Sequence, residues 1–118
     1  MVANTKDIVA KVNAAFEKNN VEGFLTFCAD DVEWTMVGDV TKKGKQAIRE
    51  WMGTMPGEVP KFDVKQTIAE GDFVVCYGDM TMKDEQKVDV EYSYCDLYRF
   101  RDGQIAELRS WVMKAGGK

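Results

Sequence analysis

The chain has 118 residues, of which 45% are hydrophobic and 31% charged, and its formal net charge at pH 7 is −4. This length suits one domain with a single core, so we expect one domain over residues 1–118. The negative charge argues against a nucleic-acid surface, which needs a basic stripe. The sequence has no apolar run of membrane-spanning length and no signal peptide at its start. We therefore expect a cytoplasmic protein that binds neither nucleic acid nor membranes.

The residue types present restrict the chemistry that the chain can perform. It has no histidine, which removes the commonest general base and any serine–histidine or cysteine–histidine pair. Its three cysteines, Cys28, Cys76 and Cys95, lack the spacing of a zinc site or a redox pair. The sequence also lacks a glycine-rich nucleotide motif and a phosphate loop. We expect no cofactor and no metal, and any reaction would use carboxylates, tyrosines, lysines or water.

Two helices are predicted at the start of the chain. The first is capped by Asn4 or Thr5, and its apolar residues are spaced for one face. Asn19-Asn20 interrupts this pattern. A second, short helix over residues 21–28 follows, and Asp30-Asp31 is expected to end it.

A strand and a third helix are predicted next. Val32–Val37 alternates apolar with polar residues, which is typical of a strand, and Gly38–Gly44 is expected to be a polar loop. The third helix is stopped by Pro56-Gly57 and Pro60. Its apolar side is formed by Ala47, Ile48, Trp51, Met52 and Met55.

The rest of the chain predicts an antiparallel meander. Strands are expected over residues 62–68, 73–82, 88–101 and 104–113. The last two flank Asp102-Gly103, which is a strong tight-turn signal. Helices followed by a meander predict an α+β domain with the helices on one face of a curved sheet.

Asp96 is the most conspicuous polar residue in the last third of the chain. It lies between Tyr94 and Tyr98 on a strand expected to be largely buried. A buried acid is costly unless it is hydrogen-bonded or kept protonated. Two interpretations are therefore open: a structural acid bonded to the backbone or to a tyrosine, or a functional acid.

Three segments carry a resemblance to a known family. They are Cys28-Ala29-Asp30-Asp31-Val32, Gly44-Lys45-Gln46-Ala47-Ile48-Arg49-Glu50-Trp51 and Asp96-Leu97-Tyr98-Arg99-Phe100. With this order of elements, the chain resembles the nuclear transport factor 2-like superfamily, in its SnoaL-like and ketosteroid isomerase-like branch. The resemblance implies a cystatin-like cone, in which three N-terminal helices pack on a strongly curved antiparallel sheet around an apolar cavity. It also implies a homodimer through the outer sheet face.

The catalytic positions of such enzymes are only partly kept in this chain. The resemblance places Met36 where a steroid isomerase has its carboxylate base, and Val12 where it has its tyrosine. Asp96 occupies the position of the oxyanion-hole aspartate. Ser110 stands where SnoaL-type cyclases have a catalytic aspartate on the last strand. These replacements argue against steroid isomerase and polyketide cyclase activity of the usual kind.

The same resemblance implies which side chains face the cavity. The catalytic candidates are Asp96 and Asp79, although a shift of one residue along the strand would turn Asp79 to solvent, and we prefer that surface interpretation. Ligand contacts are expected from Val12, Phe16, Trp34, Met36, Trp51, Met55, Tyr77, Tyr94, Tyr98, Leu108, Ser110 and Val112. Such a lining suits a small apolar or aromatic molecule held by a few polar contacts.

Three functions are open at this point, and the first is preferred. In the first, the chain binds a small apolar molecule that Asp96 anchors. Alternatively, it is an isomerase, lyase or hydrolase with Asp96 as proton donor, and Asp79, a tyrosine or water as its partner. A third possibility is a non-catalytic interaction domain, which predicts an apolar patch on the outer face of the sheet.

Overall fold

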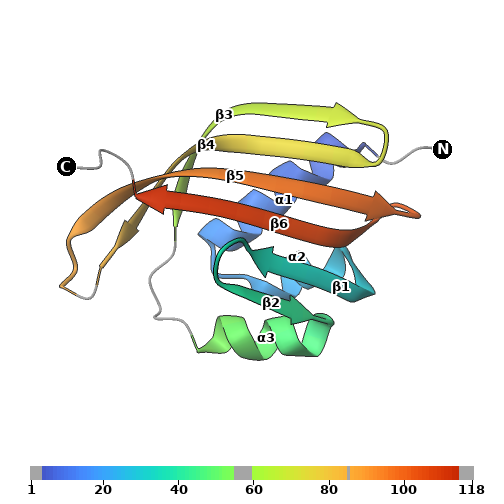
Figure 1. Ribbon diagram of the computed structural model, residues 1–118, viewed down its shortest axis with the longest axis horizontal. Coiled ribbons are helices and arrows are strands. Elements are labelled where there is room, and N and C mark those ends of the chain that lie inside the picture. Colours follow the sequence, from blue (N-terminus) through green and yellow to red (C-terminus); the bar gives the residue numbers. More distant parts are fainter. Residues whose placement is uncertain (1–3, 55–59, 85, 115–118) are drawn as a thin grey trace.

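Three helices and six strands make up the computed structural model, which describes residues 4–54, 60–84 and 86–114. The helices are α1 (Thr5–Glu17), α2 (Val21–Thr26) and α3 (Lys45–Gly53). The strands are β1 (Cys28–Met36), β2 (Val40–Lys43), β3 (Lys61–Glu70), β4 (Phe73–Lys83), β5 (Asp89–Arg101) and β6 (Gln104–Lys114). The helices cover one face of a curved sheet, with α1 against β3 and β4 and with α3 against β1 and β2 (Figure 1). The expected α+β architecture is confirmed.

The sheet has the strand order β2-β1-β6-β5-β4-β3. The meander from β3 to β6 is antiparallel, as predicted. Its last turn places both Asp102 and Gly103 at positive φ, which a two-residue hairpin turn of this kind requires. One pair departs from the expected antiparallel sheet, because β1 runs parallel to β6.

Two local predictions before residue 45 are wrong. Asp30-Asp31 does not end a helix, since α2 stops at Thr26 and both aspartates lie within β1. The cause is pairing with the distant β6, which begins where Cys28 lies beside Ile105 and the Ile105 N–H donates to the Phe27 carbonyl. The expected loop over Gly38–Gly44 contains β2, whose polar residues suit the exposed edge of a sheet.

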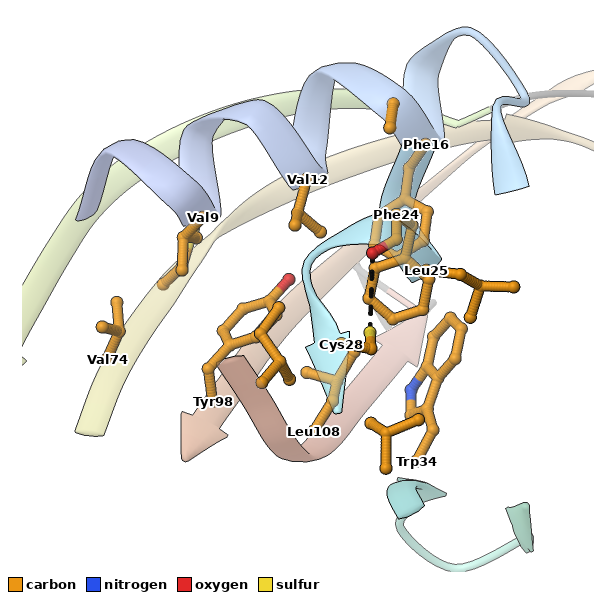
Figure 2. Close-up of a cluster of buried hydrophobic side chains, with 14 of the residues drawn as sticks. Val9, Val12, Phe16, Phe24, Leu25, Cys28, Trp34, Val74, Tyr98 and Leu108 are labelled. Carbon is orange, nitrogen blue, oxygen red and sulfur yellow. Dashed lines mark hydrogen bonds between the residues drawn. The ribbon is translucent and has the colours of Figure 1, made fainter. Parts of the chain in front are cut away.

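The core lies between α1, α2 and the inner face of the sheet. Val9 and Val12 of α1 point toward Tyr98, and Phe16 packs on Phe24 (Figure 2). Asn4 caps α1, because its side chain accepts a hydrogen bond from the Asp7 N–H at 3.2 Å. No described helix is long and apolar enough to cross a membrane.

The edge of the sheet bends where the backbones of β3 and β4 approach closely at Gly78. A Cβ atom on Gly78 would lie 2.1 Å from the carbonyl oxygen of Asp63. The pairing of β3 with β4 shifts by one residue between Val64 and Gln66, beside this contact. A β-bulge of this kind bends the strand, and β3 contacts α1 through the Phe62 N–H, which donates to the Glu17 carboxylate at 2.9 Å.

Candidate functional site

A pocket of about 280 Å³ lies between the helices and the inner face of the sheet. Most of its lining is apolar or aromatic. It is formed by Phe16, Asn19, Trp34, Met36, Trp51, Met52, Pro60, Phe62, Met80, Met82, Lys83, Tyr94, Asp96, Ser110 and Val112. Residues from the helices and from the sheet therefore meet at this pocket.

The polar centre of the pocket is a hydrogen-bonded chain of Trp34, Ser110 and Asp96. Asp96 of β5 lies directly beside Ser110 of β6. The Trp34 Nε1–H donates to the Ser110 hydroxyl oxygen at 3.0 Å, and Ser110 also hydrogen-bonds the Asp96 carboxyl group. Because an indole only donates, the single proton of Ser110 is left to donate to an ionised Asp96.

Burial dominates the electrostatics of Asp96. This side chain is only 7% exposed, and burial raises the pKa of its carboxyl group to about 7, against the lowering effect of the Ser110 hydrogen bond. Near neutral pH the group is divided between its acid and carboxylate forms. It can therefore donate or accept a proton there.

The hydrogen-bond partner of Asp96 is not one of the flanking tyrosines. The Tyr94 hydroxyl lies 3.7 Å from the Cys76 sulfur, and burial raises its pKa. The Tyr98 hydroxyl has no hydrogen-bond partner within the described part of the chain. The expected bond between a tyrosine and Asp96 is absent there, and Ser110 takes its place.

Five aromatic rings of the pocket form a continuous belt. From Trp51, successive ring centroids lie 5.0 Å apart to Trp34, 5.6 Å to Phe16, 6.5 Å to Phe62 and 5.2 Å to Tyr94. Tyr94 and Asp96 project from the same face of β5, and Trp34 belongs both to the belt and to the polar chain, so the two features adjoin. Four methionines complete the apolar wall: Met36, Met52, Met80 and Met82.

Eight of the predicted site residues line the pocket: Phe16, Trp34, Met36, Trp51, Tyr94, Asp96, Ser110 and Val112. Val12, Tyr98 and Leu108 instead belong to the core behind it, each 0% exposed. The pocket does not reach them, because α1 and α2 pack onto that end of the sheet (Figure 2). Met55 lies outside the described residues.

The placement of Tyr77 and Asp79 in the cavity is wrong. Both point to the outer face of the sheet, where Tyr77 donates to Gln66 and the Asp79 carboxylate lies 3.8 Å from the Lys65 Nζ. The alternation of β4 buries Val74, Cys76, Gly78 and Met80 and turns the residues between them outward. This agrees with the preferred surface interpretation of Asp79.

Sequence reasoning missed part of the pocket wall. Met80 and Met82 of β4 and Phe62 of β3 line it, as do Asn19, Pro60 and Lys83. The available signal was the alternation of Val74 and Cys76 with exposed residues, which continues to Met80 and Met82. Among the residues described, no group of three or more histidine, cysteine, aspartate or glutamate side chains could hold a metal ion.

The helices packed on a curved six-stranded sheet, with a pocket at one end of the core, define an α+β domain with a cystatin-like fold. The family model for the SnoaL-like domain matches residues 9–108. The chain therefore belongs to the SnoaL-like family. No curated protein matches its sequence.

Solved structures of low sequence identity share this fold. An NTF2-like protein of unknown function from Burkholderia pseudomallei has a TM-score of 0.85 at 19% identity, with 92% of this chain and 90% of that chain covered. TerC, co-crystallised with polyporic acid, has a TM-score of 0.81 at 21% identity, with coverages of 92% and 90%. A putative SnoaL-like polyketide cyclase from Shewanella putrefaciens has a TM-score of 0.82 at 15% identity, with coverages of 96% and 92%. At these identities the likeness shows the fold alone.

Proposed function

We propose that this SnoaL-like protein binds a small apolar molecule in the pocket. The observation that carries the proposal is the lining itself, in which aromatic and methionine side chains surround a few convergent polar groups. Ligand sites are typically built in this way. A volume of about 280 Å³ suits a small ligand.

Asp96 and Ser110 supply the polar anchor in this proposal. Both are buried, and among the described residues only the Ser110 side chain hydrogen-bonds Asp96, so its carboxyl group retains capacity for a ligand. The similarity to TerC, which was co-crystallised with polyporic acid, supports the use of this fold for holding a small molecule.

Filling the pocket tests the proposal. Met80 lines the pocket, whereas the adjacent Thr81 does not and belongs to the opposite phase of β4. We expect Met80→Trp to lose binding of an uncharged hydrophobic fluorescent dye such as N-phenyl-1-naphthylamine, and Thr81→Trp to keep it. Equal dye binding by both variants would contradict the proposal.

An enzyme of the isomerase, lyase or hydrolase kind is a second candidate. It is favoured by one observation: a carboxyl group with a pKa of about 7 in an apolar pocket can donate a proton at neutral pH. Its proton-transfer partner would be Tyr94 or a bound water, because Asp79 lies on the other face of the sheet. In that case Asp96→Asn would abolish turnover and keep substrate binding, whereas a binding protein would lose only affinity.

We also propose that the protein is a homodimer that packs through the outer face of its sheet. Several large apolar residues are exposed there: Ile68, Phe73, Tyr77, Trp111 and Met113. The third candidate function, a non-catalytic interaction domain, would use the same face. Sedimentation of Trp111→Glu tests the dimer, since a monomeric variant supports it and an unchanged mass contradicts it.

A cytoplasmic location suits the three free thiols.

A further inference from the structure

Within the described part of the chain, no cation lies beside the carboxyl group of Asp96. Asp96 and Lys83 are the charged residues among those described that line the pocket. Lys83 forms an ion pair with Asp89 at 2.8 Å. It lies seven residues along β4 from Cys76, the neighbour of Asp96, which is roughly 23 Å of strand. The pKa of Asp96 is set by burial and by the Ser110 hydroxyl, with no contribution from the charge of Lys83.

The elements packed around Asp96 present neutral groups to it. β6 supplies Ser110, β4 supplies Cys76, and β5 supplies the two flanking tyrosines. From β1, Trp34 donates to Ser110, and from α1 the Asn13 amide donates to the Cys76 sulfur. An ionised Asp96 is consequently stabilised within the described residues by one hydroxyl group.

The aromatic belt adds a second preference for positive charge. The face of an aromatic ring carries negative potential, so Trp, Tyr and Phe attract organic cations, and Trp does so most strongly. Here two indoles, two phenyl rings and one phenol follow one another at 5.0 to 6.5 Å around the same pocket. A buried carboxylate next to such a belt is the composition of an ammonium-binding site.

We infer that the pocket is selective for an organic cation, an alkylated ammonium group on an apolar or aromatic body, with Asp96 as its counter-ion. This inference rests on the proposed binding function and names its ligand class. The aromatic rings and methionines contact the body of the ligand and its alkyl groups. Asp96, held by Ser110, supplies the charge, and no bond is made or broken.

The sign of the pH dependence separates this ligand class from a neutral one. A cation binds the carboxylate form of Asp96, so its affinity rises as the group ionises near pH 7. A neutral ligand that accepts a hydrogen bond from the protonated acid would bind more weakly as the pH rises. The two cases predict opposite slopes through the same pH range.

Benzyltrimethylammonium and neopentylbenzene are suitable probes, because they share shape and size and differ in charge. Binding would be measured at pH 6 and pH 8 by isothermal titration calorimetry, or by quenching of the fluorescence of Trp34 and Trp51. We expect the cation to bind more tightly than its neutral isostere at pH 8. Its affinity should rise about tenfold from pH 6 to pH 8, in proportion to the ionised fraction of Asp96.

Variants locate the effect at one carboxylate. Asp96→Asn should remove both the preference for the cation and its pH dependence, and Asp79→Asn, a change on the outer face, should keep both. Equal or tighter binding of neopentylbenzene to the unmodified protein would overturn the inference and leave the binding function standing. If neither probe binds at either pH, the proposed function fails together with the inference.

Discussion

Trp34 and Ser110 are 76 positions apart in the sequence, and the indole Nε1–H of one donates to the hydroxyl oxygen of the other at 3.0 Å. The contact exists because β1 and β6 are parallel neighbours in the sheet. It fixes the acceptor side of the Ser110 hydroxyl and directs the hydroxyl proton toward Asp96. The protonation of the buried Asp96 carboxyl group is thus linked, through Ser110, to Trp34 of the aromatic belt.

Removing the Ser110 hydroxyl should raise the pKa of Asp96 further. The Ser110 hydrogen bond favours the carboxylate form and opposes burial, so Ser110→Ala leaves burial unopposed. NMR titration of the Asp96 carboxyl carbon would measure the shift. Ser93→Ala, which changes an exposed serine on the same strand, should leave the titration unchanged. A pKa that falls in Ser110→Ala would contradict the hydrogen-bonding scheme.

Asp96 should make the protein less stable as the pH rises from about 4 to about 7. Its pKa is raised in the folded state from the usual 3.8 of an exposed aspartate to about 7, so the folded state binds this proton more tightly than the unfolded state. The resulting stabilisation is complete below pH 4 and is lost as the pH rises through 7. At low pH this stabilisation raises the free energy of unfolding by roughly 4 kcal/mol.

The measurement is the free energy of unfolding at several pH values, compared between the unmodified protein and Asp96→Asn. Their difference isolates Asp96 from the surface carboxylates. Two of these, Asp31 and Asp89, have pKa values lowered by ion pairs and act in the opposite direction. A difference that does not change between pH 4 and pH 7 would contradict the burial of an ionisable Asp96.

Gly78→Ala should destabilise the protein by about 3 kcal/mol, because the new Cβ would lie 2.1 Å from the Asp63 carbonyl oxygen. Chemical denaturation measures the change. Gly53→Ala is the matched control, since a Cβ there meets nothing within 4 Å. Equal stabilities of the two variants would mean that β3 and β4 are further apart than described.

Tyr98→Phe should be neutral or stabilise the protein by about 1 kcal/mol. The Tyr98 hydroxyl is buried with no hydrogen-bond partner among the described residues, so its desolvation is not compensated. Thermal unfolding of Tyr98→Phe and Tyr94→Phe would compare this hydroxyl with one that contacts Cys76. A marked loss of stability in Tyr98→Phe would show that its hydroxyl is bonded.

The sequence predicted most of the fold because its signals are local. Helical spacing in α1, alternation in the meander and the Asp102-Gly103 turn each depend on neighbours within a few residues. The end of α2 could not be predicted in this way. The residues that follow Thr26 form β1, which pairs with β6, and no residue near Asp30-Asp31 in the sequence indicates that pairing.

The site was predicted only in part, because some of its contacts also join residues that are distant in the sequence. Asp96 and Ser110 were found through family positions, but their bond to Trp34 depends on the packing of distant strands. The error at Tyr77 and Asp79 was one of phase: β4 turns Met80 and Met82 inward, and a shift of one residue exchanges the two faces.

Native mass spectrometry of the protein purified from its own host tests most directly whether the pocket holds a small molecule. We predict an additional mass that denaturation releases, retained by Thr81→Trp and lost from Met80→Trp. A protein that carries no bound molecule, and whose unmodified and pocket-filled forms behave alike toward hydrophobic probes, would contradict the account.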